Sequence, residues 1–369
     1  MSFILTLTLL LHGAIHILGF VKSVRPNTLP MLRAPISRVH GALWLVTATL
    51  FTTAAAMHAV AKPYWFYAAA LGVVLSQYGI VRSWKDARFG TLVNVALLFP
   101  IAFSGLTHAP WSTQLQYQRE STRLVTVKPS IVPNVSEESI RHLPTIVQRY
   151  LHFVGAVGKH MVLNYAVEFR GALRSNPGDD WMDVVVHQQS TTSPPARLFL
   201  VEARMFGVPV TAYHRLVDGN ASFSVSAASL FNIAHAEGAI MNASESVTLL
   251  NDMVLLAPAT LVDTNITWQQ IDSLTVRAMF KHAGTTVSAT LYFSNTGALR
   301  TFVSEDRYRT TDGKTYERYP WHTPISAWTE AGGRRFPKSA SAVWSLPEGD
   351  FEYGKLEVIS INYNRNSAR

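Results

Sequence analysis

Two histidines four residues apart, His12 and His16, form the clearest chemical pattern in the chain. At this spacing both imidazoles lie on one face of a helix, and the neighbouring residues are apolar, so a polar side chain there is costly. One interpretation is a metal site, a haem site or a proton relay, completed by His40 or His58. This would make the chain a membrane redox or metal-dependent enzyme.

The alternative interpretation is structural. Ser76, Gln77 and Asn94 lie in the other apolar stretches of the same region, where they can hydrogen-bond to the imidazoles and hold the helices together. We favour this interpretation because a histidine pair without carboxylates or cysteines is a weak metal signal. The intramembrane polar residues are therefore predicted to be His12, His16, Gln77 and Asn94, with no metal and no cofactor.

A second polar cluster lies near the carboxyl end, in Ser-Glu-Asp-Arg-Tyr-Arg from residue 304 and Tyr-Pro-Trp-His from residue 319. An acid/base pair of Glu305 or Asp306 with His322 is one interpretation. Ion pairs between strands are the favoured one. We expect a ligand-binding or polar cluster of Glu305, Asp306, Arg307, Trp321 and His322, and we assign no catalytic residue.

Several chemistries find no support. The chain has no cysteine, which excludes disulfides, thiolate catalysis and cysteine-ligated metals. It contains no Gly-x-Gly-x-x-Gly, Gly-x-Ser-x-Gly or His-Glu-x-x-His run, so nucleotide binding and two hydrolase classes lack a motif. The sequence alone leaves open whether the chain is an enzyme.

The composition points to a membrane. Charged residues make up 15% and hydrophobic residues 48%, whereas soluble domains carry about 25% charged residues. Residues 1–110 hold eight lysines and arginines and one acid, and so account for +7 of the net charge of +8. Because the basicity belongs to the most apolar third of the chain, no nucleic-acid partner is expected.

Four apolar stretches predict a bundle of four transmembrane helices at 1–21, 39–61, 63–81 and 89–118. Pro100 is expected to kink the fourth helix or mark its exit from the bilayer. The first stretch has no basic residue before Lys22 and is expected to be retained rather than cleaved.

Basic residues in the loops predict the orientation. Lys22, Arg25, Arg33 and Arg38 follow the first stretch, and Arg82, Lys85 and Arg88 follow the third, so both loops are expected in the cytoplasm. The amino terminus and the carboxyl-terminal part then face outward. We expect a multi-pass protein of the inner cell membrane, with the lipid bilayer as a partner.

The rest of the chain predicts an α+β domain dominated by a large, curved antiparallel sheet with two helices. Residues 111–134 are predicted to be a linker and residues 135–369 the outward domain, after a transmembrane domain at 1–110. The helices are expected at 136–154, divided by Pro144, and at 244–258. Two-residue alternation, as in Leu163 to Phe169, predicts about ten strands.

The chain resembles an uncharacterised family of bacterial membrane proteins. The likeness rests on His-Gly-x-x-His-x-x-Gly-Phe from residue 12, Trp-Lys-Asp-Ala-x-Phe-Gly-Thr from residue 84, and Leu-Pro-Glu-Gly-Asp-Phe from residue 346. It implies four amino-terminal transmembrane helices followed by an extracytoplasmic β-rich domain, and no activity. The curved sheet with helices is also similar to periplasmic lipid and lipoprotein carriers, by analogy of fold alone.

Three functions are compatible with the sequence. The favoured one is binding of a lipid or another hydrophobic ligand at the membrane surface, by a sheet with an apolar concave face. The second is the membrane enzyme based on His12 and His16, or an outer hydrolase. The third is an envelope interaction or structural protein, with an unknown protein partner. A solid core without a cavity would exclude the first.

Overall fold

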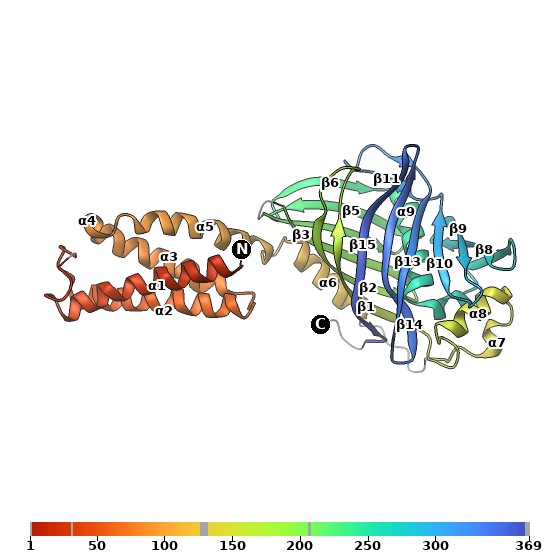
Figure 1. Cartoon of the computed structure of the whole chain (residues 1–369), viewed down its shortest axis with the longest axis horizontal. Coiled ribbons are helices and arrows are strands. Elements are labelled where there is room, and N and C mark those ends of the chain that lie inside the picture. The colour runs from red at the N-terminus through yellow and green to blue at the C-terminus, as the bar shows by residue number, and fades with distance from the viewer. Residues whose placement is uncertain (1, 31, 126–131, 206–207, 366–369) are drawn as a thin grey trace. The chain divides into compact units, whose positions relative to one another are not determined.

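The chain forms two compact units, Met1–Ala109 and Pro110–Arg369. The structure, a computed structural model, describes residues 2–30, 32–125, 132–205 and 208–365. Figure 1 shows a helical first unit and a second unit built around a large sheet. The two units are considered separately.

The first unit consists of helices. Their bounds are α1 (Ser2–Val24), α2 (Arg38–Ala59), α3 (Trp65–Arg82), the short α4 (Trp84–Ala87) and α5 (Gly90–Thr107). All four predicted apolar stretches are thus helical. The fourth is shorter than predicted, because α5 ends at Thr107, shortly before Pro110, rather than at residue 118. Pro100 lies inside α5.

Three of these helices, α1, α2 and α5, are long and apolar enough to cross a membrane. The prediction of four such helices is corrected to three, because α3 does not meet these criteria. This helix has 18 residues, includes Ser76 and Gln77, ends with Arg82, and is not among the three candidate spans. The described structure therefore supports a membrane anchor.

The glycines near the histidine pair permit close helix packing. A Cβ atom at Gly19 would lie 2.2 Å from the ring of Trp44 on α2, and one at Gly13 would lie 3.2 Å from the Ala48 carbonyl oxygen. Small residues of this kind let transmembrane helices approach closely. The glycines of the amino-terminal motif therefore allow α1 to pack closely on α2.

The described residues of the second unit form one antiparallel sheet of 13 strands and a separate two-stranded ribbon. The strands of the first half are β1 (Asn164–Leu173), β2 (Met182–Thr192), β3 (Pro195–Met205), β4 (Val208–Val217), β5 (Asn220–Ala227) and β6 (Phe231–Glu237). Those of the second half are β7 (Ile266–Gln270), β8 (Thr275–His282), β9 (Thr285–Phe293), β10 (Leu299–Ser304), β13 (Trp321–Ala331), β14 (Arg334–Leu346) and β15 (Gly349–Tyr363). The ribbon pairs β11 (Tyr308–Arg309) with β12 (Glu317–Arg318).

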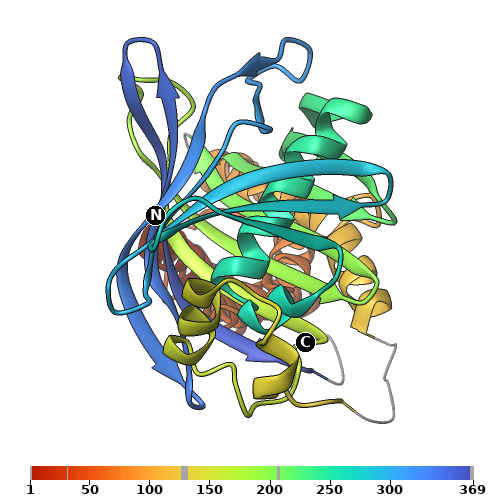
Figure 2. The ribbon, with the colours of Figure 1, turned by 90° about the vertical axis from the view of Figure 1, so that its right-hand side faces the viewer.

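The strand order is β6-β5-β4-β3-β2-β1-β15-β14-β13-β10-β9-β8-β7, so the carboxyl-terminal strand pairs with β1 at the centre. The two edge strands, β6 and β7, are consecutive in the chain. They are connected by α9 (Ala239–Leu255) and the 3-10 helix η1 (Pro258–Val262). The chain thus returns from one edge to the other by way of a helix, and Figure 2 shows that helix lying over the concave face of the sheet.

Part of the predicted linker at 111–134 is helical, because it contains α6 (Thr113–Val125). Its apolar residues are few, but Tyr117 and Leu124 pack on Leu198 and Leu200 of β3, on the face of the sheet opposite α9. This tertiary contact stabilises a helix that the sequence pattern alone does not indicate. Residues 126–131 of the predicted linker lie outside the described residues.

The predicted helix at 136–154 is confirmed with its interruption. Ser136 and Ser139 form a capping box at the start of α7 (Glu137–Ile140), and α8 (Thr145–Phe153) begins directly after Pro144. The second predicted helix begins earlier than expected, at Ala239 instead of residue 244. Gly238 precedes it with a φ of 93°, a conformation that favours glycine. The sheet also has more strands than the ten predicted.

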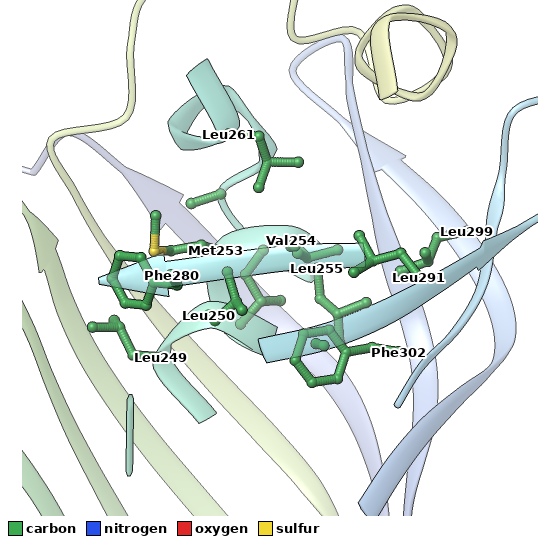
Figure 3. Packing of buried hydrophobic residues seen from close by; sticks show 14 of the residues in the cluster. Leu249, Leu250, Met253, Val254, Leu255, Leu261, Phe280, Leu291, Leu299 and Phe302 are labelled. Carbon is green, nitrogen blue, oxygen red and sulfur yellow. The ribbon is translucent and has the colours of Figure 1, made fainter. Parts of the chain in front are cut away.

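The core of the second unit lies between α9 and the strands β8, β9 and β10. Figure 3 shows Leu250 and Val254 of α9 packed near Phe280, Leu291 and Phe302. All five side chains are at most 1% exposed. One side of α9 is therefore fixed in a dense apolar core, which leaves another side to face the first half of the sheet.

Candidate functional site

A cavity of about 480 Å³ lies between α9 and the concave face of the sheet. Its wall is mainly apolar, with side chains contributed by β3, β4, β5, β14 and β15. These include Phe199, Val201, Ala203, Val210, Ala212, Phe223, Val225, Ala340, Ala342, Leu356 and Val358. The volume falls within the range of about 300–1,000 Å³ that small-molecule sites occupy.

Strand alternation explains this wall. Phe199, Val201 and Ala203 of β3 face the cavity, whereas Leu198 and Leu200 between them face α6. Two-residue periodicity thus gives the first half of the sheet two apolar faces. One face is covered by a helix, and the other borders the cavity.

The cavity side of α9 carries charged residues, which is unusual in so buried a helix. Glu245 and Asp252 are 1% and 7% exposed, and Arg197 of β3 is 4% exposed. Arg197 Nη1 donates to Glu245 Oε2 at 3.1 Å, and its Nε donates to Asp252 Oδ2 at 2.6 Å. One guanidinium therefore connects two positions on α9 to the sheet.

Two further side chains complete this network. His214 Nδ1 of β4 lies 2.8 Å from Glu245 Oε1, and Gln188 Nε2 of β2 donates to Asp252 Oδ2 at 2.7 Å. The Gln188 Oε1 atom is buried and has no hydrogen-bond partner among the described residues, although Gln188 borders the cavity. Three neighbouring strands thus hold the two carboxylates.

The electrostatic environment separates these carboxylates. Burial by itself would raise the pKa of Glu245, but His214 and Arg197 outweigh burial and lower that pKa to about 2. For Asp252, burial outweighs the attraction of Arg197 and raises the pKa above its ordinary value. Glu245 therefore stays ionised throughout the physiological range.

Arg307 lines the cavity and is held by aromatic and hydroxyl groups. Its guanidinium carbon lies 4.4 Å from the ring centroid of Trp321 and 5.3 Å from that of Trp344. Its Nη1 donates to Tyr353 Oη at 3.1 Å, and its Nε donates to Thr248 Oγ1 at 3.3 Å. Stacking and these hydrogen bonds fix the orientation of a cation at the wall.

The predicted polar cluster is divided by the structure. Arg307 and Trp321 line the cavity, and Glu305, Asp306 and His322 do not. Glu305 is exposed, and its carbonyl oxygen accepts a hydrogen bond from Arg318.

Asp306 and His322 are directed to different partners. Asp306 pairs with Arg318 at 2.8 Å and accepts hydrogen bonds from Ser288, while His322 lies 3.6 Å from Asp350. The acid/base pair between Asp306 and His322 is therefore not among the described contacts, because each side chain is directed to another partner.

The predicted site does not include four residues of this network: Arg197, His214, Glu245 and Asp252. A signal was present in Leu-Leu-Asn-Asp-Met-Val-Leu-Leu from residue 249, where an acid interrupts an otherwise apolar helical run. Glu245 lies about two turns earlier on the same helix face. Acidic residues on the buried face of a helix predict a cationic partner, but the pattern does not say which strand supplies it.

The histidine pair of the first unit is engaged in hydrogen bonds. His12 Nε2 lies 2.9 Å from Asn94 Oδ1 and 3.3 Å from Ser76 Oγ, and His16 Nε2 lies 2.9 Å from the same Ser76 Oγ. Asn94 in turn donates to Gln77 Oε1 at 3.0 Å. This network connects α1, α3 and α5, as the structural interpretation predicts.

The other histidines lie apart from this pair. His58 Nδ1 lies 2.8 Å from Thr6 Oγ1, and His40 Nδ1 lies 2.8 Å from Ser37 Oγ. Within the described ranges, no group of three or more His, Asp or Glu side chains is arranged to hold a metal ion. The donor set at His12 and His16 therefore does not extend beyond two imidazoles.

The fold and the cavity define a class of protein with apolar amino-terminal helices and a large antiparallel sheet domain. A model of a family of unknown function, DUF6544, matches residues 133–356, and the chain belongs to this family. The match extends from just before α7 into β15 and does not include the amino-terminal helices. No curated protein matches the chain.

Two solved structures show distant likeness. One is a DUF1329 family protein from Desulfovibrio piger, at 10% identity and a TM-score of 0.35, covering 64% of this chain and 96% of that one. The other is a putative outer membrane lipoprotein-sorting protein domain from Vibrio parahaemolyticus, at 6% identity and a TM-score of 0.31, covering 54% and 85%. Likeness at this level identifies no ligand for this chain.

Proposed function

We propose that this chain is a membrane-anchored protein whose outward unit binds a lipid or another hydrophobic ligand in the cavity under α9. The observation that carries the proposal is the cavity itself. Its wall is mainly apolar, and a volume of about 480 Å³ is enough for a small hydrophobic molecule. Helices α1, α2 and α5 supply the anchor.

The apolar wall continues to exposed residues. Met205, at the end of β3, and Ile233, on the edge strand β6, line the cavity and are 48% and 58% exposed. Exposed apolar surface of this kind is a liability in water unless a ligand or a membrane covers it. A hydrophobic ligand would therefore meet an apolar rim before it reaches the interior.

The enzyme alternative has less support. His12 Nε2 and His16 Nε2 are used in hydrogen bonds to other helices, and His16 Nδ1 bonds to the His12 carbonyl oxygen within α1. In the second unit, His322 is not paired with Asp306 among the described contacts. Neither proposed set of catalytic groups is therefore arranged to act on a substrate.

The test uses two substitutions on neighbouring residues of β15. Val358 lines the cavity, and Ile359 is 47% exposed and does not line it. Full-length protein in detergent is titrated with an apolar fluorescent probe. Val358→Trp, which fills the cavity, is expected to weaken binding by at least about tenfold, equivalent to roughly 1.4 kcal/mol. Ile359→Trp is the matched control and is expected to bind as the wild type does.

Equal probe binding by all three proteins would contradict the proposal. It would place the apolar binding surface outside the cavity and favour the alternative of an envelope interaction protein. The edge strand β6, where Phe231 is 67% exposed, is the surface that this alternative would use.

A further inference from the structure

The cavity has a cationic end in addition to its apolar wall. Four arginines and two carboxylates belong to the described residues that line it. Both carboxylates are already bonded to Arg197. The other three arginines, Arg174, Arg307 and Arg309, are here called the arginine end.

The arginines of this end stack on a continuous set of aromatic rings. Arg174 lies 5.2 Å and Arg309 lies 6.0 Å from the ring centroid of Phe351. Phe351 is followed by Tyr353 at 6.3 Å, and Tyr353 by Trp344 at 6.1 Å, over which Arg307 lies. The ring contacts place all three guanidinium groups along one aromatic surface, whose rings belong to strands β14 and β15.

Two of these cations form no direct ion pair among the described residues. Arg309 pairs with Glu317 at 2.9 Å, whereas Arg307 and Arg174 act on Glu245 and Glu352 only at longer range. Arg174 donates instead to the carbonyl oxygen of Glu352 at 2.9 Å. A half-buried cation whose carboxylates lie beyond ion-pair distance is stabilised further by an anion that binds directly to it.

Arg307 is also held in a conformation suited to an anion. Its Nε and Nη1 donate to Thr248 and Tyr353, and Tyr353 Oη accepts a second hydrogen bond from Trp321 Nε1 at 3.0 Å. Its second η nitrogen has no acceptor among the described residues. A guanidinium whose position is fixed in this way loses little entropy when it binds a carboxylate or a phosphate.

We propose that the ligand of this cavity is an anionic amphiphile, with its carboxylate or phosphate group at Arg307 and Arg174. Its hydrocarbon portion lies against Phe199, Phe223 and Leu356 of the apolar wall. This inference rests on the proposed function and adds the charge of the ligand to it. A neutral amphiphile would leave Arg174 and Arg307 without a directly bonded anion.

The test compares ligands that share one chain and differ in the headgroup. Oleate, 1-oleoyl lysophosphatidate, oleyl alcohol and inorganic phosphate compete with the apolar probe on full-length protein in a neutral detergent. We expect oleate or lysophosphatidate to bind about tenfold more tightly than oleyl alcohol, as a charge-assisted hydrogen bond predicts. The tighter of the two identifies the headgroup, and phosphate alone is expected not to displace the probe.

Substitutions assign the effect to the arginine end. Arg307→Gln is expected to weaken the anionic ligand about tenfold and to leave oleyl alcohol unchanged. Arg307→Lys keeps the charge but not the guanidinium that Thr248 and Tyr353 hold, and is expected to retain only part of the affinity. Arg300→Gln is the matched control, because Arg300 is exposed on β10 and outside the cavity. Arg174→Gln is a second variant, in case Arg307→Gln lowers the thermal stability.

Two results would overturn the inference without touching the proposed function. One is that oleate, lysophosphatidate and oleyl alcohol bind with equal affinity, and that Arg307→Gln and Arg174→Gln do not change these affinities. The other is binding of inorganic phosphate as tight as that of either anionic amphiphile, which would indicate an anion site without a chain. If no amphiphile binds and Val358→Trp has no effect, the proposed function fails, and this inference fails with it.

Discussion

Arg197 of β3 and Glu245 of α9 form an ion pair at 3.1 Å in which both side chains are at most 4% exposed. The pair fixes the helix that covers the cavity to the strands that form its wall. Because desolvation opposes such a pair, its net contribution to stability is small or unfavourable relative to an apolar pair, but the removal of one partner is costly. The position of α9, and so the shape of the cavity, depends on this contact.

Removal of one partner is the first prediction. Glu245→Gln removes one of the two carboxylates of Arg197 and leaves Asp252 as its remaining partner, so we expect a loss of up to about 3–5 kcal/mol in the stability of the second unit. Glu330→Gln is the control, because Glu330 and Arg335 are about half exposed and such pairs contribute about 0–1 kcal/mol. Thermal unfolding followed by circular dichroism measures both, and equal melting temperatures would refute the role of the pair.

The dependence of this effect on pH is the second prediction. The folded-state pKa of Glu245 is about 2, below the ordinary value of 4.5, so its contribution is fully present above the ordinary pKa. The contribution is lost as pH falls from about 4.5 to about 2, when the carboxyl becomes protonated. The difference in melting temperature between the wild type and Glu245→Gln is therefore expected to shrink over this interval, and a difference independent of pH would contradict the assignment.

The histidine network gives the third prediction. Ser76 Oγ lies within hydrogen-bond distance of both His12 and His16, so Ser76→Ala removes a group shared by two imidazoles. We expect a loss of roughly 0.6–2 kcal/mol in the stability of the first unit. Ser104→Ala in α5 is the control, because the described structure gives the Ser104 side chain no hydrogen bond. Identical thermal stability of the two variants in detergent would argue against a structural network.

A glycine at the centre of the sheet gives the fourth prediction. A Cβ atom at Gly171 of β1 would lie 1.8 Å from the Lys355 carbonyl oxygen of β15, which is backbone and does not move easily. At Gly354 of β15 the nearest atom is the end of the Leu173 side chain, at 3.0 Å. Gly171→Ala is expected to destabilise the second unit by about 1–3 kcal/mol, and Gly354→Ala by less. The reverse order in denaturant unfolding would contradict the strand pairing.

The topology is the fifth prediction, and the absence of native cysteines makes it accessible. Single cysteines at Lys62, Lys85 and Asn295 are treated in intact cells with a reagent that does not cross the membrane. With the amino terminus outside and α3 crossing, Lys62→Cys and Asn295→Cys react and Lys85→Cys does not. Reaction at Lys62→Cys and Lys85→Cys but not at Asn295→Cys would show that only three helices cross.

Much of the fold can be predicted from the sequence, because apolar runs and residue alternation are patterns among neighbouring residues. The apolar stretches, the division of a helix at Pro144 and the alternation in β1 and β9 all reflect the environment of a few neighbouring residues. Helix α6 does not, because its apolar residues are too few to indicate a helix until β3 covers them. The strand order could not be predicted either, because the pairing of β15 with β1 joins residues far apart in the chain.

The candidate site was less predictable for the same reason. Arg307 and Trp321 were recognised from their types, but their separation from Asp306 and His322 depends on which face of the sheet each occupies. The partnership of Arg197 with Glu245 and Asp252 depends on the path of α9 between the two edge strands. A single sequence determines neither the face of the sheet that each residue occupies nor the path of α9.

The most direct measurement of the central claim is photocrosslinking in native membranes with a photoreactive fatty acid, followed by mass spectrometry of the modified peptides. A hydrophobic ligand in the cavity predicts modification of peptides from β3, β4 and β15, with a lower yield in Val358→Trp than in Ile359→Trp. Modification confined to the helices α1 to α5, with the same yield in both variants, would contradict it.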